Sequence, residues 1–174
     1  EDCNCLAALS FSKLSVTMGF VSDEVLKYLL TLFKSKDEMT RKHALIALRN
    51  LSASSKDKGA FFKLNIPALM AGVLSDKEKD LDVLAAATLR SLPCCSSCIT
   101  DKCLEDGILH SVIRSIPNAN VELKSQIAAI VANLSEHLAC QPIMISHAVV
   151  KAICILSTVD HGDVMKVRDL SSYS

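Results

Sequence analysis

The chain has 174 residues, of which 50% are hydrophobic and 22% are charged, enough apolar content for a buried core. Lysine plus arginine equals aspartate plus glutamate at 19 each, and this formal net charge of zero argues against a nucleic-acid partner. No apolar run approaches the roughly 20 residues that span a bilayer, so we expect no membrane insertion.

A short phrase recurs along the chain and predicts its architecture. It reads LRNLS at 48–52, LRSLP at 89–93 and VANLS at 131–135. A degenerate copy, LAALS, occurs at 6–10, and VRDLS follows at 167–171. The leucine in fourth position of the first four copies falls at 9, 51, 92 and 134, which gives steps of 42, 41 and 42 residues. A fixed period of this length indicates a stacked helical solenoid.

Each period contains three predicted helices in the same order. The first has one apolar face, the second is longer and carries the phrase, and the third is a short closing helix. None of them can bury its apolar stripe alone, so we expect neighbouring units to stack. The first helices are expected at 26–33, 66–74, 108–116 and 149–154, and the short ones at 61–64, 99–104 and 143–145.

We expect a single domain, residues 1–174, built from full and partial repeats. The chain begins within one copy of the phrase and stops just after another, so we expect a piece of a longer array. End helices without an outer neighbour expose apolar surface, which predicts self-association through the solenoid ends. The expected units are a partial repeat at 1–24, full repeats at 25–65, 66–107 and 108–148, and a partial or degenerate repeat at 149–174.

Four of the eight cysteines lie close together, at Cys94, Cys95, Cys98 and Cys103. With His110 nearby, this cluster has the residue types of a zinc site or a regulatory thiol. It also coincides with the turn after a long helix, where cysteine acts as a small apolar residue. We therefore predict no metal site and no cofactor, with reduced thiols in a cytoplasmic or nuclear protein. No catalytic Cys–His or Ser–His–Asp pattern and no phosphate-binding glycine loop is present, so we predict no enzyme.

The repeat unit resembles the armadillo repeat. The matching features are a short helix, a helix of the Ile-Pro-x-Leu type that begins at Ile66, and a long helix that ends in ALRNLS at 47–52. HEAT repeats are the near alternative, but they usually pair two helices. The resemblance implies an all-α, right-handed α-solenoid, an armadillo-repeat superhelix with three helices in each ~42-residue repeat. It also implies that the long helices line a concave groove.

The function that this resemblance implies is a non-enzymatic scaffold for protein–protein interaction. Its groove would bind an extended segment or a partner helix. The alternative is a regulatory subunit or adaptor of the armadillo type, such as a small-GTPase regulator, a chaperone or a ubiquitin-ligase component.

In the armadillo family, the signature asparagine commonly grips the backbone of an extended peptide. That role maps onto Asn50 and Asn133, and it fails at Ser91 and Asp169. Nuclear-import members also carry a tryptophan four residues earlier, which sandwiches lysine stems. This chain has no tryptophan, so we do not expect that mode of binding. The residues that take this position are Ile46, Ala87, Ala129 and Met165.

Arg49 and Arg90 occupy the same position in two adjacent repeats. Two guanidinium groups about one helix spacing apart, roughly 8–10 Å, could clamp a carboxylate of an acidic segment. Alternatively, both side chains are solvated or pair with acidic residues of their own array. The predicted partner-binding groove comprises Lys42, Ile46, Arg49, Asn50, Ala87, Arg90, Ser91, Ala129 and Asn133.

Overall fold

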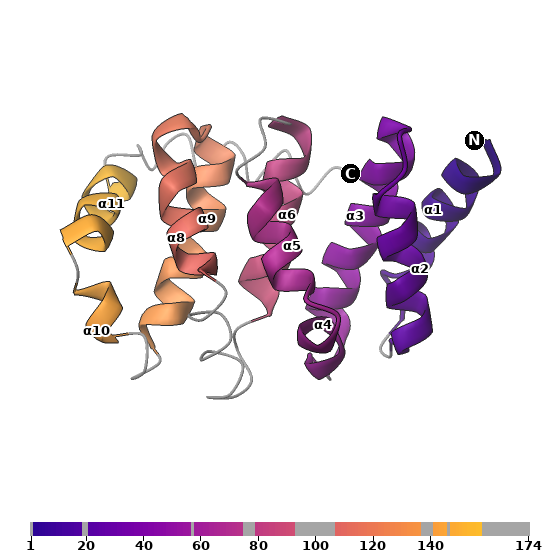
Figure 1. Ribbon diagram of the computed structural model, residues 1–174, viewed down its shortest axis with the longest axis horizontal. Coiled ribbons are helices and arrows are strands. Elements are labelled where there is room, and N and C mark those ends of the chain that lie inside the picture. Colours follow the sequence, from indigo (N-terminus) through magenta and orange to yellow (C-terminus); the bar gives the residue numbers. More distant parts are fainter. Residues whose placement is uncertain are drawn as a thin grey trace.

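The computed structural model describes residues 2–18, 21–56, 58–74, 79–92, 107–136, 141–145 and 147–157. In these ranges the regular secondary structure is helical, and the helices stack in one row of two layers (Figure 1). The long helices of the rear layer are α1 (Asp2–Leu14), α3 (Glu38–Ser54), α6 (Lys79–Ser91) and α9 (Val121–Ser135). The front layer contains α2 (Asp23–Phe33), α5 (Ile66–Val73) and α8 (Ile108–Ser115).

Shorter elements connect the two layers and extend the row. The predicted short closing helix is present as α4 (Gly59–Lys63) and as α10 (Gln141–Met144). The 3-10 turn η1 (Ile116–Asn118) follows α8, and α11 (His147–Ser157) lies at the far end of the row from α1 (Figure 1). The thiol cluster, the expected helix at 99–104 and the phrase at 167–171 lie outside the described residues.

The long helices α3 and α9 each begin directly after a polar residue that caps the first turn. The Asp37 side chain accepts a hydrogen bond from Thr40 N at 2.8 Å, and Asn120 accepts one from Leu123 N at 2.8 Å. Each bond satisfies one of the backbone N–H groups that the first turn of a helix leaves without a partner. The capping side chain therefore sets the start of α3 and of α9.

The turn into the front layer also repeats with the period of the sequence. Asn65 precedes α5 with φ 56°, and Gly107 precedes α8 with φ 65°. The two residues are 42 positions apart, so the same left-handed turn occurs at the same point of two units. Glycine and asparagine are the residues that adopt this conformation most readily.

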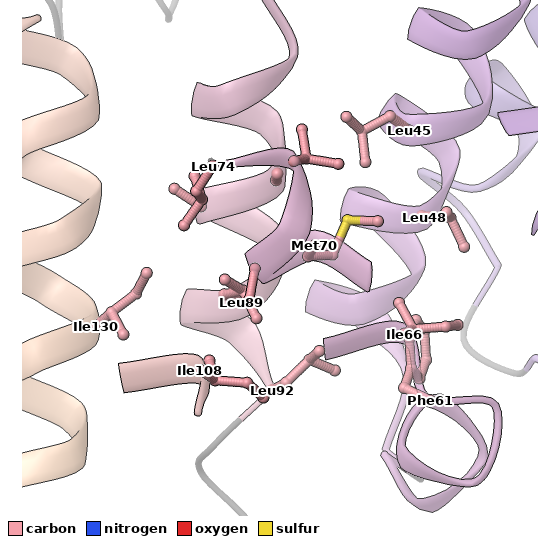
Figure 2. Packing of buried hydrophobic residues seen from close by; sticks show 14 of the residues in the cluster. Leu45, Leu48, Phe61, Ile66, Met70, Leu74, Leu89, Leu92, Ile108 and Ile130 are labelled. Atoms are coloured by element: carbon pink, nitrogen blue, oxygen red, sulfur yellow. The ribbon is translucent and has the colours of Figure 1, made fainter. Parts of the chain in front are cut away.

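The apolar residues of the phrase form the core between the two layers. Leu51, Leu92 and Leu134 are exposed to only 1%, 1% and 2%, and Leu48 and Leu89 are buried as well. Figure 2 shows Leu48, Leu89 and Leu92 gathered with Met70 and Ile108 of the front layer. One continuous cluster of buried side chains runs from α1 to α11 and includes residues of both layers and of α4. Stacking therefore buries the stripes that single helices leave exposed.

The first unit differs from the predicted spacing. The serine that ends the phrase donates its hydroxyl to the carbonyl three residues earlier, from Ser52 to Arg49 at 2.7 Å and from Ser135 to Ala132 at 2.7 Å. Directly after α1, Ser15 donates to the Ser12 carbonyl at 2.8 Å, and Ser15 is buried like Ser52. Ser12 makes a similar bond to Leu9, but the side chain of Asn50 in α3 bonds to the Ser12 carbonyl and Ser15 Oγ, which fixes the register. The first copy of the phrase is therefore FSKLS at 11–15, and the prediction of a copy at 6–10 is wrong.

The length of the first connection explains this error. The described residues between α1 and α2 contain no equivalent of α4, so fewer residues separate the phrase from the next front-layer helix. From Ser15 to Asp23 is 8 positions, whereas from Ser52 to Ile66 is 14. A constant step of 42 residues consequently places the phrase too early in α1.

Among the described residues, no helix combines the length and the hydropathy that a bilayer crossing requires.

Candidate functional site

The predicted groove residues lie on the rear-layer helices at equivalent positions. We call the side of α3, α6 and α9 that carries them the long-helix face. α3 packs against α6, and α6 packs against α9, so the equivalent positions form columns across three neighbouring helices. Arg49 and Arg90 are exposed, and Ala87 is buried. The partly buried members are Lys42, Ile46, Asn50, Ser91, Ala129 and Asn133.

Asn50 makes its hydrogen bonds to the preceding long helix. Its Nδ2 donates to the Ser12 carbonyl at 3.2 Å and to Ser15 Oγ at 3.2 Å, both on the α1 side. Its Oδ1 accepts from Arg49 Nη1 at 3.2 Å. A side-chain amide has two N–H donors, so both donors of Asn50 are engaged. We use the term amide bridge for a bond from such a side chain to a carbonyl of the preceding long helix.

Asn133 forms the same amide bridge one pair of helices further on. Its Nδ2 donates to the Arg90 carbonyl at 3.1 Å, which links α9 to α6. Arg90 directly precedes Ser91, the residue equivalent to Asn133. In α1, Ser12 therefore corresponds to Arg90 and Lys13 corresponds to Ser91. This assignment agrees with the first copy of the phrase at 11–15.

The pair α3–α6 lacks an amide bridge because Ser91 replaces the asparagine. Ser91 Oγ donates instead to the Ala87 carbonyl of its own helix at 3.0 Å. A serine hydroxyl is shorter than an amide and readily bonds to the carbonyl four residues earlier. Of the three contacts between described long helices, two have the bridge and the middle one does not.

Comparison of sequences finds no family and no curated protein that matches this chain. Comparison of structures finds a designed armadillo repeat protein with a TM-score of 0.64 and 17% identity, covering 95% of this chain and 80% of that chain. The fold is an armadillo-repeat solenoid.

Two further structures are similar to this armadillo fold. A second designed armadillo repeat protein, in complex with the peptide (KR)4, has a TM-score of 0.59 and 13% identity, covering 83% of this chain and 72% of that chain. An engineered protein has a TM-score of 0.71 and 16% identity. That match covers 81% of this chain, which spans 59% of the engineered protein's length.

The amide bridges occupy the asparagines that the armadillo resemblance predicts to bind a peptide backbone. Asn50 and Asn133 both donate to a neighbouring helix, and both N–H donors of Asn50 are engaged, so donation to a peptide carbonyl requires Asn50 to exchange a bond. Sequence reasoning missed the bridges, because the acceptors are backbone carbonyls of another repeat. The only sequence signal is the asparagine itself, which a peptide-binding role explains equally well.

Arg49 and Arg90 on the long-helix face differ in the hydrogen bonds made by the residue that follows each of them. Arg49 donates to Asn50 Oδ1, and Asn50 is in turn fixed to α1. Next to Arg90, Ser91 bonds within its own helix. One guanidinium group is therefore oriented by a chain of hydrogen bonds that begins on the preceding repeat.

Two carboxylates with shifted pKa values lie at helix starts. The hydrogen bond from Lys63 lowers the pKa of Asp23, and the same pair raises the pKa of Lys63. Lys63 Nζ lies 2.5 Å from Asp23 Oδ2 and joins α4 to the start of α2. The hydrogen bond from the Thr40 hydroxyl lowers the pKa of Asp37, the capping residue of α3. These groups serve the helix ends and the connection between units.

The zinc hypothesis cannot be placed on the described part of the chain. Cys94, Cys95, Cys98 and Cys103 lie outside it, and His110 is exposed on α8. Within the described ranges, no group of three or more histidine, cysteine, aspartate or glutamate side chains is arranged to hold a metal ion.

Proposed function

We propose that this chain is a non-enzymatic scaffold that binds an extended segment or a partner helix of another protein along the concave groove of its long helices. The observation that supports this proposal is the repetition of exposed and partly buried positions across α3, α6 and α9. A designed protein of similar fold has been seen with a peptide. Repeated positions let a partner gain affinity from several modest contacts.

The chemistry of the long-helix face favours an acidic partner. The position of Ile46, Ala87 and Ala129 carries aliphatic side chains and no charge, with Ile46 and Ala129 partly buried and Ala87 buried. Arg49 and Arg90 stand beside it as exposed cations. A basic peptide such as (KR)4 would be repelled by these two charges, whereas carboxylates would be attracted.

Two variants test whether partners bind to the long-helix face: one places a tryptophan on this face, and the other places a tryptophan on the front layer as a control. Peptides that bind the wild-type chain are first selected from a random display library. Ala132 is exposed on α9, and we expect Ala132→Trp to weaken the selected peptides by tenfold or more, about 1.4 kcal/mol. Gly72 is exposed on α5 with no atom near its Cβ position, so Gly72→Trp is the matched control and should leave binding unchanged.

Equal binding by both variants and the wild type would count against the long-helix face as the working surface. The regulatory alternative makes a different prediction, since a small-GTPase regulator should capture its partner in one nucleotide state only. A scaffold captures it in both.

We also propose that the chain self-associates through its end helices. Leu14 of α1 is 57% exposed, whereas the equivalent Leu51, Leu92 and Leu134 are almost fully buried. Apolar groups in this position drive stacking in the other units. Sedimentation should show a concentration-dependent mass that Leu14→Asn reduces, and a monomer at every concentration would contradict the proposal.

A further inference from the structure

We propose that Lys13, Arg49 and Arg90 form a basic ridge that binds successive carboxylates of an extended acidic segment in a partner protein. The three residues are exposed near the C-terminal ends of α1, α3 and α6. This inference rests on the proposed function, and it specifies that the bound segment is acidic, extended and placed across α1, α3 and α6.

Lys13 becomes the third cation when α1 is aligned with the other long helices by its contacts in the structure. The amide bridges from Asn50 to the Ser12 carbonyl and from Asn133 to the Arg90 carbonyl align Lys13 with Asn50 and Ser91, and Ser12 with Arg49 and Arg90. Lys13 is therefore one position along the helix, and about 100° around it, from the column of the two arginines, at the position where Asn50 of α3 turns toward the preceding helix. A constant sequence period places Ala7 and Ala8 at the positions equivalent to Arg49 and Asn50 instead. The period alone therefore does not predict that Lys13 belongs to the ridge.

The ridge has no opposite charge at neighbouring positions on its own helices. Around Arg49, the residues three and four positions away are Leu45, Ile46, Ser52 and Ala53. Around Lys13 they are Leu9, Ser10, Val16 and Thr17, and before Arg90 they are Ala86 and Ala87. The i±3 and i±4 ion pairs that often neutralise a surface cation are thus missing at these positions, which favours a carboxylate from outside the chain.

The ridge ends at α9, where the partner should change in character. Ala132 takes the place of the arginines, and the next exposed ionisable residue of this helix end is Glu136. An acidic segment is therefore attracted to α1, α3 and α6, and its continuation over α9 should be uncharged or basic.

Asn50 acts as a positioning residue for the ridge. It accepts a hydrogen bond from Arg49 through Oδ1 while both of its N–H groups hold the α1 side. This arrangement fixes the guanidinium group above the contact between α1 and α3 before any partner arrives. A group that is held in its binding position loses less entropy when the partner binds.

The spacing of the ridge selects an extended occupant. Packed helices lie about 8–10 Å apart. A polyproline II segment rises ~3.1 Å per residue and turns every third residue, so side chains three positions apart lie ~9.3 Å apart on one side. Acidic residues at every third position can therefore reach successive cations. An α-helix rises ~5.4 Å per turn, so carboxylates one turn apart are too close together and those two turns apart, at ~10.8 Å, lie slightly beyond the spacing of the ridge.

The experiment uses synthetic peptides of about 12 residues, which at ~3.1 Å per residue cross all four long helices. One peptide carries glutamate at every third position in a proline-rich background, and two analogues carry glutamine or lysine there. We expect fluorescence anisotropy to give at least tenfold weaker binding for the glutamine analogue and no binding for the lysine analogue. High salt should weaken the acidic peptide, because the charges are exposed.

Substitutions then locate the binding to the ridge. Lys13→Gln, Arg49→Gln and Arg90→Gln should each weaken the acidic peptide severalfold, and the triple variant should abolish its preference over the glutamine analogue. Arg114 is exposed on α8, so Arg114→Gln is the control and should have no effect. Unchanged binding by the triple variant would overturn the ridge. If Ala132→Trp still blocks the library-selected peptides in that case, the scaffold function survives and only the ridge fails.

A pair of asparagine variants tests the positioning role. Asn50→Ser and Asn133→Ser each remove an amide bridge, but only Asn50 stands beside a ridge residue, since Ala132 precedes Asn133. Both variants should lose thermal stability. Only Asn50→Ser should also weaken the acidic peptide, when measured well below both unfolding transitions. Equal loss of affinity in both variants, or no loss in Asn50→Ser, would contradict the positioning role.

Discussion

The contacts α3–α6 and α6–α9 are built from nearly the same phrase and yet differ. Both bury the apolar residues of the phrase, but only α6–α9 has the amide bridge, from Asn133 to the Arg90 carbonyl. In α3–α6, Ser91 turns back onto its own helix. Stacking thus depends on apolar burial, which both contacts share. The bridge is a separate polar device that individual repeats add or omit.

The largest expected effect comes from the shared apolar core. Leu89 is 3% exposed in the middle of the array, so Leu89→Ala leaves a cavity in a contact that has no bridge to compensate. We expect a loss of about 2–5 kcal/mol in the free energy of unfolding, measured by urea denaturation. A loss below about 1 kcal/mol would mean that burial does not hold this contact.

Removal of an amide bridge should cost less. Asn133→Ala deletes the donor to the Arg90 carbonyl, and a net hydrogen bond contributes about 0.5–1.5 kcal/mol to stability. Asn50→Ala should cost more, because Asn50 donates to two acceptors and holds Arg49. Urea denaturation of the two variants checks this order, and a larger loss for Asn133→Ala would reverse it.

Adding an amide bridge to the α3–α6 contact tests the same comparison in the opposite direction. The Arg49 carbonyl already accepts a hydrogen bond from the Ser52 hydroxyl. The Ser12 carbonyl shows that two such bonds are compatible, because it accepts one from the Ser15 hydroxyl and one from Asn50 Nδ2. We therefore expect Ser91→Asn to bond to the Arg49 carbonyl and to stabilise the chain by up to about 1 kcal/mol. A raised melting temperature supports this expectation, and a lowered one would show that the α3–α6 geometry differs from the other contacts.

The sequence could predict the parts of this fold that depend on one repeat at a time. The phrase residues Leu48, Leu92 and Val131 are buried as expected, because periodicity alone reveals an apolar face. The caps at Asp37 and Asn120 likewise depend on local chemistry. These features identify the helices and their inward faces without any knowledge of the neighbouring unit.

The sequence could not predict the features that depend on two repeats. The bridge from Asn50 requires the Ser12 carbonyl to lie opposite it, and this depends on how α1 and α3 are packed. The place of Lys13 depends on the shortened connection after α1, which a constant period conceals. For the same reason, the nine predicted groove residues included Arg49 and Arg90 but left out Lys13.

The smallest expected effect is the dependence of stability on pH. The pKa values of Asp23 and Asp37 are lowered from 3.8 in the folded chain, so the unfolded chain binds more protons as the pH falls. Their stabilising contribution is present above this value and is lost as the pH falls through the folded pKa. The melting temperature should therefore drop slightly at acidic pH. In Asp37→Asn, which keeps an acceptor for the cap but cannot titrate, the drop should be smaller.

Hydrogen exchange across the long helices tests the central comparison most directly. In the wild-type chain, we predict faster exchange in α6 on the side that faces α3 than in α9 on the side that faces α6, because only the latter contact has an amide bridge. In Ser91→Asn this difference should shrink, while exchange in α9 stays the same. Equal protection of both contacts in the wild type, or an unchanged difference in Ser91→Asn, would contradict the account.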